Sequence, residues 1–270
     1  MRNVTSLAIR SLHVYPLKSC KGISVREAVL ERQGLRDDRR WMVVDQAGDF
    51  VTQRTEPRLA LVHATVVRES DGAGGLVLDA PGLEPLRIPA ASSTGSARSA
   101  VRVWGYEVEA EDCGSEAATW MTRWLGSPVR IVATPKDFHR PVGSAYATPG
   151  DCVGFADGFP LLIVNTASLA DLNSRLEHPL PMNRFRPNIV VDGADPWDED
   201  RWKHIRIGGV GIRVVDPCVR CAVTTTDQDT ATTGAEPLRT LATFRREGKG
   251  VIFGQNGIPD GEGILRVGMS

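Results

Sequence analysis

The chain has 270 residues, of which 41% are hydrophobic and 24% charged, with a formal net charge of −1. This is the composition of a globular protein with a sizeable core, and its balanced charge argues against a nucleic-acid-binding protein that relies on bulk positive charge. No stretch reaches the roughly 20 apolar residues that span a bilayer, and the first ten residues lack the apolar core of a signal peptide. We therefore expect a cytoplasmic protein without a membrane span.

The first hundred residues show the short apolar runs and turn residues that predict a β-rich segment. Two apolar runs around Gly48 predict a hairpin over residues 40–53, whereas residues 90–100, rich in Ser and Ala, predict a surface loop. Further strands are predicted over residues 12–17, 25–30, 59–67, 76–78, 101–104 and 107–110. Many short strands at close spacing favour a barrel or a curled sheet.

The middle of the chain changes to helical periodicity. Ser115 is expected to cap a helix in which apolar side chains recur one turn apart, at Trp120, Met121, Trp124 and Leu125. Residues 135–151 hold several Pro and Gly residues and predict a loop or linker. A second helix is expected to begin at a Thr166 cap and to stop at Pro179, with one apolar face formed by Leu169, Leu172 and Leu176.

The last third of the chain returns to strand patterns. A hairpin is predicted around Gly208-Gly209, between strands over residues 205–207 and 211–215. Other strands are predicted over residues 188–191, 222–226, 251–253 and 264–267, and a helix over residues 237–246. Because strands and helices do not alternate regularly, the predicted fold class is α+β and β-rich, without repeated βαβ units.

The cysteines are Cys20, Cys113, Cys152, Cys218 and Cys221, an odd number that predicts reduced thiols and not a disulfide framework. In Cys218-Val-Arg-Cys221, Arg220 precedes the second thiol, and a neighbouring cation favours the thiolate that binds soft metals. The spacing is equally compatible with two small buried residues at a strand start. A zinc site would need a second ligand pair, and a thioredoxin-type redox pair would need a following helix.

Three polar segments offer cations for an anion. Lys18 and Ser19 precede Gly22, but the glycine pattern of a P-loop is missing. Four arginines around the 40–53 hairpin can bind phosphate bidentately: Arg39, Arg40, Arg54 and Arg58. On composition alone, surface ion pairs with Asp37, Asp38 and Glu56 explain them better. The segment from Asn183 to Asn188 reads by default as a polar surface turn.

Taken in order along the chain, five motifs resemble the MOSC family. They are Lys18-Ser-Cys-Lys-Gly22, Thr52-Gln-Arg-Thr-Glu-Pro-Arg58, Asn183-Arg-Phe-Arg-Pro-Asn188, Cys218-Val-Arg-Cys221 with Thr224-Thr225, and Phe253-Gly-Gln255. Each motif is weak alone, but the ordered set is specific and covers nearly the whole chain. The resemblance, which includes the amidoxime-reducing members of the family, implies an N-terminal MOSC β-barrel domain over residues 1–135. The resemblance also implies that this domain packs against a MOSC β-barrel domain over residues 136–270, with the two halves interlocked around a cofactor.

The family binds a molybdopterin-type molybdenum cofactor, so the resemblance implies the same here. Cys221 corresponds to the catalytic thiolate that ligates molybdenum. The implied cofactor contacts are Lys18, Ser19, Arg39, Asp157, Gly158, Phe159, Arg186, Asn188, Cys218, Val219, Arg220 and Asn256. Lys18, Arg39 and Arg186 can neutralise a phosphate, Asp157 and Asn188 can bond pterin edges, and Arg220 can keep Cys221 deprotonated.

The resemblance implies an oxidoreductase that reduces small N-hydroxylated compounds with electrons from a separate protein of the ferredoxin, flavoprotein or cytochrome type. The cysteine run of a plant-type ferredoxin domain is missing. Two other functions stay open, namely a MOSC module that carries sulfur or cofactor without turnover, and an interaction domain with an unused pocket. The segment Asp227-Gln-Asp-Thr-Ala231 departs from the family's usual Asp-Pro-Asp-Thr-Gly turn, which leaves the local backbone open.

Overall fold

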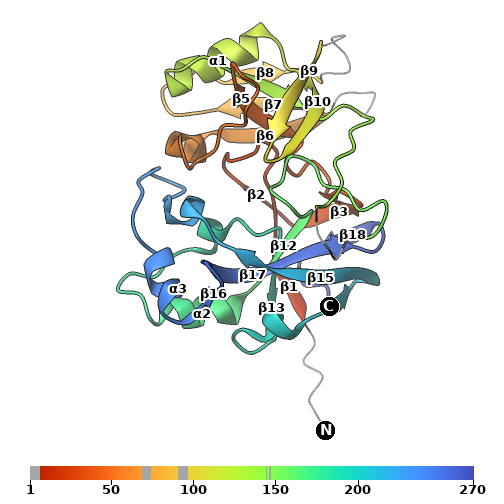
Figure 1. The fold of residues 1–270 in the computed structure, drawn as a ribbon, viewed down its shortest axis with the longest axis vertical. Coiled ribbons are helices and arrows are strands. Elements are labelled where there is room, and N and C mark those ends of the chain that lie inside the picture. The colour runs from red at the N-terminus through yellow and green to blue at the C-terminus, as the bar shows by residue number, and fades with distance from the viewer. Residues whose placement is uncertain (1–6, 69–73, 91–96, 144, 146) are drawn as a thin grey trace.

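The computed structural model describes residues 7–68, 74–90, 97–143, 145 and 147–270. Figure 1 shows two bodies stacked along the long axis of the molecule. The described residues form three α-helices and a much larger number of strands. The predicted α+β, β-rich class is therefore confirmed.

The lower body in Figure 1 is built on one large sheet with strands from both ends of the chain. The sheet has the order β14-β15-β17-β12-β13-β1-β2, with β16 paired to β17. Its strands are β1 (Ala8–Val14), β2 (Ile23–Val25), β12 (Leu161–Asn165), β13 (Ile189–Asp192), β14 (His204–Ile207), β15 (Val210–Val219), β16 (Arg246–Glu247) and β17 (Gly250–Pro259). Helix α2 (Thr166–Asn173) packs against β12 and β13, and α3 (Leu238–Phe244) packs against β17.

The two ends of the chain interlock in this lower body. β1 pairs antiparallel with β13, and the last strand, β18 (Gly263–Arg266), pairs with β3 (Glu27–Glu31). β3 in turn pairs with the short β4 (Gly34–Leu35). The first four strands thus belong to the same body as the second half of the chain, and a division at residue 135 stays a prediction.

The upper body contains two antiparallel sheets and one helix. One sheet has the order β5 (Trp41–Asp45), β11 (Val129–Ala133), β10 (Tyr106–Asp112) and β9 (Arg98–Val103), and the other has β6 (His63–Arg68), β7 (Gly74–Asp79) and β8 (Leu86–Ile88). Helix α1 (Ser115–Leu125) packs against β11 and β8. It buries Ala117, Met121, Trp124 and Leu125, the face that its apolar spacing predicts.

Apolar patterning explains the centre of the large sheet. β12 and β13 are nearly continuous apolar runs that pair in parallel and are buried along almost their whole length. Such runs are typical of strands that are covered on both faces. The loops that adjoin β12 and β13 are therefore anchored to two buried strands.

Several local predictions are wrong in their details. The strand over residues 59–67 is divided, because Pro57 starts the 3₁₀-helix η1 (Pro57–Leu61) and β6 begins only at His63. The 90–100 loop ends earlier than expected, since β9 begins at Arg98; residues 91–96 lie outside the described part. Neither predicted cap residue acts as one: Gly114 precedes α1, and Asn165 caps α2 by accepting a hydrogen bond from Ala167 N over 3.1 Å. Helix α2 also ends at Asn173, before Pro179.

The strand predicted over residues 222–226 is also wrong. These residues form the 3₁₀-helix η5 (Ala222–Thr225). Thr224 Oγ1 donates to the Cys221 carbonyl over 3.0 Å, and Thr225 Oγ1 donates to the Ala222 carbonyl over 2.7 Å. Threonine hydroxyls that bond to the backbone three residues earlier compete with sheet pairing, and here they favour the tight turn. Two other 3₁₀-helices are η3 (Met182–Phe185) and η4 (Asp198–Arg201).

Candidate functional site

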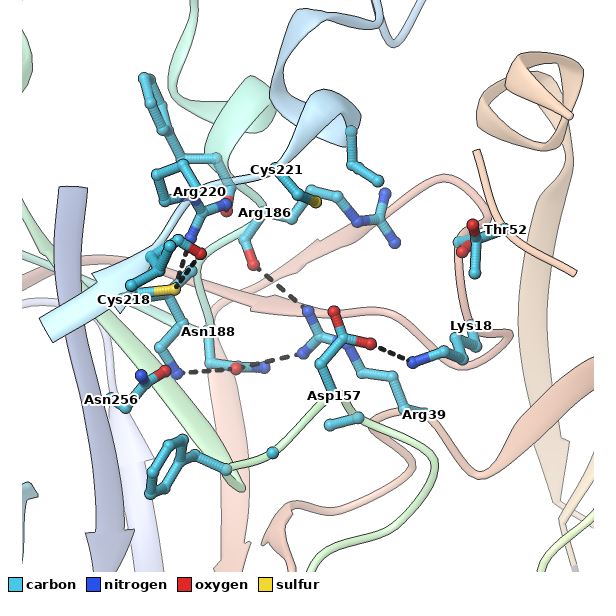
Figure 2. A pocket seen from close by; sticks show the side chains of 18 of the residues that line it. Lys18, Arg39, Thr52, Asp157, Arg186, Asn188, Cys218, Arg220, Cys221 and Asn256 are labelled. Carbon is cyan, nitrogen blue, oxygen red and sulfur yellow. Dashed lines mark hydrogen bonds and ion pairs between the residues drawn. The ribbon is translucent and has the colours of Figure 1, made fainter. Parts of the chain in front are cut away.

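One cavity of about 800 Å³, open to solvent, collects side chains from both halves of the chain. Figure 2 shows side chains from distant segments facing each other across it. All thirteen residues that the resemblance implies line this cavity: Lys18, Ser19, Arg39, Asp157, Gly158, Phe159, Arg186, Asn188, Cys218, Val219, Arg220, Cys221 and Asn256.

Loops and strand ends of the lower body place these residues. Lys18 and Ser19 follow β1, and Arg39 precedes β5. The segment 157–159 leads into β12, and Arg186 and Asn188 lie between η3 and β13. Residues 218–221 span the end of β15 and the start of η5, and Asn256 lies within β17. The cavity therefore lies where the central strands of the large sheet meet the N-terminal segments.

Unusual backbone conformations gather at the cavity. Among the described residues, seven that are not glycine have a positive φ, and three of these line the cavity: Ser19 (67°), Arg39 (48°) and Arg186 (55°). A fourth, Trp104 (56°), contacts the cavity residue Asp157. A left-handed conformation costs about 1–2 kcal/mol for such residues and clusters at functional sites.

The cavity is strongly electropositive. Its lining holds one carboxylate, Asp157, and five cations: Lys18, Arg39, Arg54, Arg186 and Arg220. The whole chain, by contrast, has a net charge of −1. A concentration of positive charge in a concave site favours an anionic ligand.

Two of the arginines share one aromatic ring. The guanidinium carbons of Arg39 and Arg186 lie 4.3 and 4.4 Å from the centre of the Tyr15 ring. Tyr15 is buried, and its hydroxyl donates to the Pro187 carbonyl over 3.1 Å. Burial raises the pKa of Tyr15 to about 12, so the ring stays neutral and can stack on both cations.

Arg39 also reaches the segment that carries Arg186. It forms an ion pair with Asp38, donates to Asn188 Oδ1 over 3.1 Å and donates to the Arg186 carbonyl over 3.3 Å. Figure 2 shows the last two bonds as dashed lines. Arg39 therefore ties the N-terminal segment to the loop before β13.

Arg186 keeps a spare donor. Its Nη1 donates to Gln228 Oε1 over 3.1 Å, while its Nη2 is buried without a partner among the described residues. Burial lowers the pKa of the Arg186 guanidinium to about 10, and Arg39 acts in the same direction, so the group is still a cation at neutral pH. Arg220 Nε is likewise buried without a partner in the described chain. Buried unsatisfied donors that line a cavity indicate a ligand that accepts from them.

Lys18 is already paired. Its Nζ forms an ion pair with Asp157 and donates to the Phe155 carbonyl over 2.7 Å. Although the Asp157 side chain is 60% exposed, the Lys18 ammonium holds the pKa of that carboxyl well below its usual range. Trp104 Nε1 donates to the same carboxylate over 3.2 Å. Lys18 therefore fixes Asp157, whereas Arg186 and Arg220 each keep a buried donor without a partner among the described residues.

The expectation that Arg220 acts on Cys221 is wrong. Arg220 Nη1 lies 2.8 Å from Cys218 Sγ, and its Nη2 donates to the Phe185 carbonyl over 2.7 Å. In extended backbone, residues two apart project on the same side, and this brings Arg220 to Cys218. Burial raises the pKa of the Cys218 thiol although Arg220 opposes that shift, whereas Cys221 is the exposed cysteine.

Sequence reasoning missed one residue that shapes the cavity. Arg140 is 1% exposed and lies in the 135–151 loop. It donates to the Gly154 carbonyl from Nε and Nη2, over 3.1 and 2.8 Å, and also to the carbonyls of Ala156 and Asp157. It thus holds the segment that carries Asp157. A lone arginine in a loop gives no sequence signal for this role.

The basic cluster around the hairpin is divided by the structure. Arg39 and Arg54 line the cavity, and Arg54 stacks 4.4 Å from the Trp104 ring. Arg40 lies outside the cavity and bonds to Gln33 and Glu31. Arg58 also lies outside and stacks on Trp124. Of the ion pairs expected with Asp37, Asp38 and Glu56, the structure shows Arg39–Asp38 in the described part of the chain, and phosphate binding by Arg39 and Arg54 stays a prediction.

Two family models match the sequence of this chain. They are the MOSC N-terminal beta barrel domain over residues 6–128 and the MOSC domain over residues 151–270. The chain belongs to the MOSC family. It is 39% identical to mitochondrial amidoxime-reducing component 1 of Homo sapiens, over 96% of this chain and 81% of that one, and 37% identical to the Mus musculus protein of that name, over 96% and 80%. It is 39% identical to mitochondrial amidoxime reducing component 2 of Bos taurus, over 88% of this chain and 72% of that one.

In the part of the chain that the structure describes, no helix is long and apolar enough to cross a membrane.

Proposed function

We propose that this chain is an oxidoreductase that uses a molybdenum cofactor, bound through Cys221, to reduce N-hydroxylated compounds such as amidoximes and hydroxylamines. Relatives named for amidoxime reduction, which align with most of the chain, support this activity. The observation that carries the proposal is one electropositive cavity that combines an exposed thiol with all the residues implied by the family resemblance.

The residues present fit such a cofactor. It brings a phosphate, a polar pterin and a soft metal, and MOSC domains are associated with its binding. The unpartnered donors Arg186 Nη2 and Arg220 Nε can donate hydrogen bonds to oxygen atoms of such a group. A cysteine thiolate is a ligand that a soft metal prefers. When bound, the cofactor supplies the two-electron chemistry, and the protein supplies binding and orientation.

The chain's own residues have distinct roles in this proposal. Arg39 and Arg186, both stacked on Tyr15, hold the phosphate. Asp157 and Asn188 bond to the pterin; Lys18 keeps Asp157 ionised and in place. Cys221, the exposed cysteine that lines the cavity, ligates the metal.

We further propose that a separate protein, of the ferredoxin, flavoprotein or cytochrome type, supplies the electrons. No flavin or nicotinamide fingerprint occurs in the sequence. The five cysteines are all free thiols, which supports a reducing compartment such as the cytoplasm. The cavity is lined by residues from 18–54 and from 156–256, so turnover should need both halves of the chain.

Turnover is the direct test of the proposed activity. We expect molybdenum-loaded protein, made in a host that synthesises molybdopterin, to reduce an amidoxime or a hydroxylamine with a low-potential artificial donor under anaerobic conditions. NADH alone should give no product. Product formation is compared with that of the same chain made without cofactor. If loaded protein gives no more product than empty protein across several N-hydroxylated substrates, the sulfur- or cofactor-carrier function becomes the better explanation.

The arginine pair offers a second test that does not need turnover. Arg39→Ala and Arg186→Ala should each lower the pterin content of purified protein, because a hydrogen bond to a charged group contributes about 1.5–3 kcal/mol, or roughly tenfold or more in binding. The matched control is Arg40→Ala, which removes a neighbouring arginine outside the cavity. Pterin is measured by fluorescence after oxidative release. Equal pterin in Arg186→Ala and Arg40→Ala would contradict the phosphate role.

A further inference from the structure

Two buried glutamines link the halves of the chain just behind the cavity wall. Gln53 and Gln228 are 1% and 3% exposed, and neither lines the cavity. Gln53 Nε2 donates to Gln228 Oε1 over 3.1 Å, and Gln228 Nε2 donates to Gln53 Oε1 over 3.0 Å. Gln53 follows the β5 hairpin and Gln228 lies in the turn after η5, so this reciprocal pair joins segments 175 residues apart.

Each amide also holds a group beside the cavity. Gln53 Nε2 donates to the Ser19 carbonyl over 2.6 Å, and Gln228 Oε1 accepts a second bond, from Arg186 Nη1, over 3.1 Å. Gln228 Nε2 gives its other hydrogen to the Thr226 carbonyl over 3.0 Å. Both amide nitrogens use both hydrogens, and Gln228 Oε1 uses both lone pairs. A network in which every amide hydrogen is used favours a single arrangement of the two side chains.

Arg186 is the cavity side chain that this network orients. The Tyr15 ring, 4.4 Å from the guanidinium carbon, restrains the position of the group over the ring face. The bond to Gln228 then fixes the direction of Nη1. Nη2 is left as the buried donor without a partner in the described chain. The glutamine network and the ring together determine where that donor points.

The use of an amide has an electrostatic consequence. A carboxylate in place of Gln228 could also accept from Arg186, but it would cancel the positive charge and lose the two donations from Gln228 Nε2. Lys18 and Arg39 are paired with Asp157 and Asp38, whereas no carboxylate among the described residues forms an ion pair with Arg186. A neutral acceptor fixes the group and leaves its charge available to an anion.

We propose that Gln228, held in place by Gln53, is a positioning residue that aims the Arg186 guanidinium at an anionic group of the ligand and leaves its charge uncompensated. The identity of that group as the molybdopterin phosphate rests on the proposed function. The geometry itself requires only an anion. Two measurements therefore separate the two proposals: the pterin content of loaded protein and the orthophosphate affinity of empty protein.

The experiment uses four variants of the full chain. Gln228→Glu keeps the shape and the acceptor for Arg186, but adds a negative charge and removes the two donations from Nε2. Gln228→Met keeps the approximate shape without hydrogen bonds. Gln53→Met removes the supporting amide only. Gln33→Met is the matched control, because the Gln33 side chain bonds to Arg40 and the Phe138 carbonyl outside the cavity. Melting temperatures of the empty proteins report any general loss of stability.

We expect Gln228→Glu to lower pterin content and orthophosphate affinity of the folded protein by at least about tenfold. Its empty form should also melt lower, because a carboxylate cannot donate to Gln53 Oε1 and the Thr226 carbonyl. Gln228→Met should lower both by about tenfold, Gln53→Met by less, and Gln33→Met should change neither. A purely structural glutamine would instead lower the melting temperature of the Met variants and leave the phosphate affinity of the folded protein unchanged.

Wild-type pterin content and phosphate affinity in Gln228→Glu would overturn the positioning role. The positioning role is also refuted if Gln228→Met and Gln53→Met melt at lower temperatures but bind orthophosphate with wild-type affinity. If Gln228→Met does not fold, the pterin content and phosphate affinity of Gln228→Glu and Gln53→Met test the positioning role. Wild-type protein that lacks pterin but binds orthophosphate in a Gln228-dependent way would refute the proposed function and support the positioning role, whereas protein that binds neither refutes both.

Discussion

Replacing Cys221 by alanine is expected to abolish molybdenum retention, whereas replacing Cys218 should leave most of it. Cys221 is exposed at the cavity, and its sulfur has no hydrogen-bond partner among the described residues. Burial raises the pKa of the Cys218 thiol although Arg220 opposes that shift, and the Cys218 Sγ is already occupied by its contact with Arg220 Nη1. The structure thus distinguishes two thiols that the sequence spacing alone leaves equivalent.

The measurement is the molybdenum content per protein molecule after purification from a host that makes molybdopterin. Loss of partners outside the ligand shell of a metal typically weakens binding by about 10–100-fold, and loss of the protein's own ligand should exceed that. Cys221→Ala should therefore fall by more than about tenfold, and Cys218→Ala by far less. Equal molybdenum in wild type and Cys221→Ala would refute the ligand assignment. One equivalent of zinc in both wild type and Cys218→Ser would point to a different metal chemistry altogether.

The local parts of the fold could be predicted because short-range physics decides them. The amphipathic spacing of α1, the glycine pair between β14 and β15, and the apolar runs of β12 and β13 each define an element within a few residues. The strand expected over residues 222–226 was wrong because two threonine hydroxyls bond back to the chain, and β propensity does not register that competition.

The long-range parts could not be predicted from local pattern. Nothing in the sequence of β1 indicates that it pairs with β13, or that β18 returns to β3. These pairings bring Lys18 and Arg39 to the same cavity as Arg186. The resemblance identified these cavity residues, but not the contacts behind them. The Gln53–Gln228 pair and the Tyr15 ring between two arginines depend on side-chain packing across the two halves.

The structure shows how the turn after the cysteines, which departs from the family pattern, is stabilised. In the segment Asp227-Gln-Asp-Thr-Ala231, Asp227 Oδ1 accepts from the backbone nitrogens of Asp229 and Thr230, over 3.0 and 2.9 Å. Ala231 takes a left-handed conformation with φ of 59°. The turn is therefore held by its first aspartate, and the second position is free to contribute a side chain, Gln228, to the network behind Arg186.

Arg140 offers the largest expected effect on stability. Among the described residues, its buried guanidinium donates to backbone carbonyls, those of Gly154, Ala156 and Asp157, and burial lowers its pKa because the cation is removed from water. Arg140→Leu would leave these carbonyls without donors, and each buried unsatisfied group costs about 1–3 kcal/mol. We expect the free energy of unfolding to fall by about 3 kcal/mol, less than the sum because the buried cation is also lost.

The matched control is Arg102→Leu, which removes an exposed arginine that pairs with Asp49 on the surface, and should have a far smaller effect. Arg140→Lys should recover only part of the stability, because one ammonium cannot reproduce the planar fork that reaches three carbonyls. Urea unfolding of the empty proteins gives the free energies. Since Arg140 holds the segment that carries Asp157, pterin content should also fall in folded Arg140→Lys. If Arg140→Leu unfolds at the same urea concentration as Arg102→Leu, Arg140 does not hold the cavity wall.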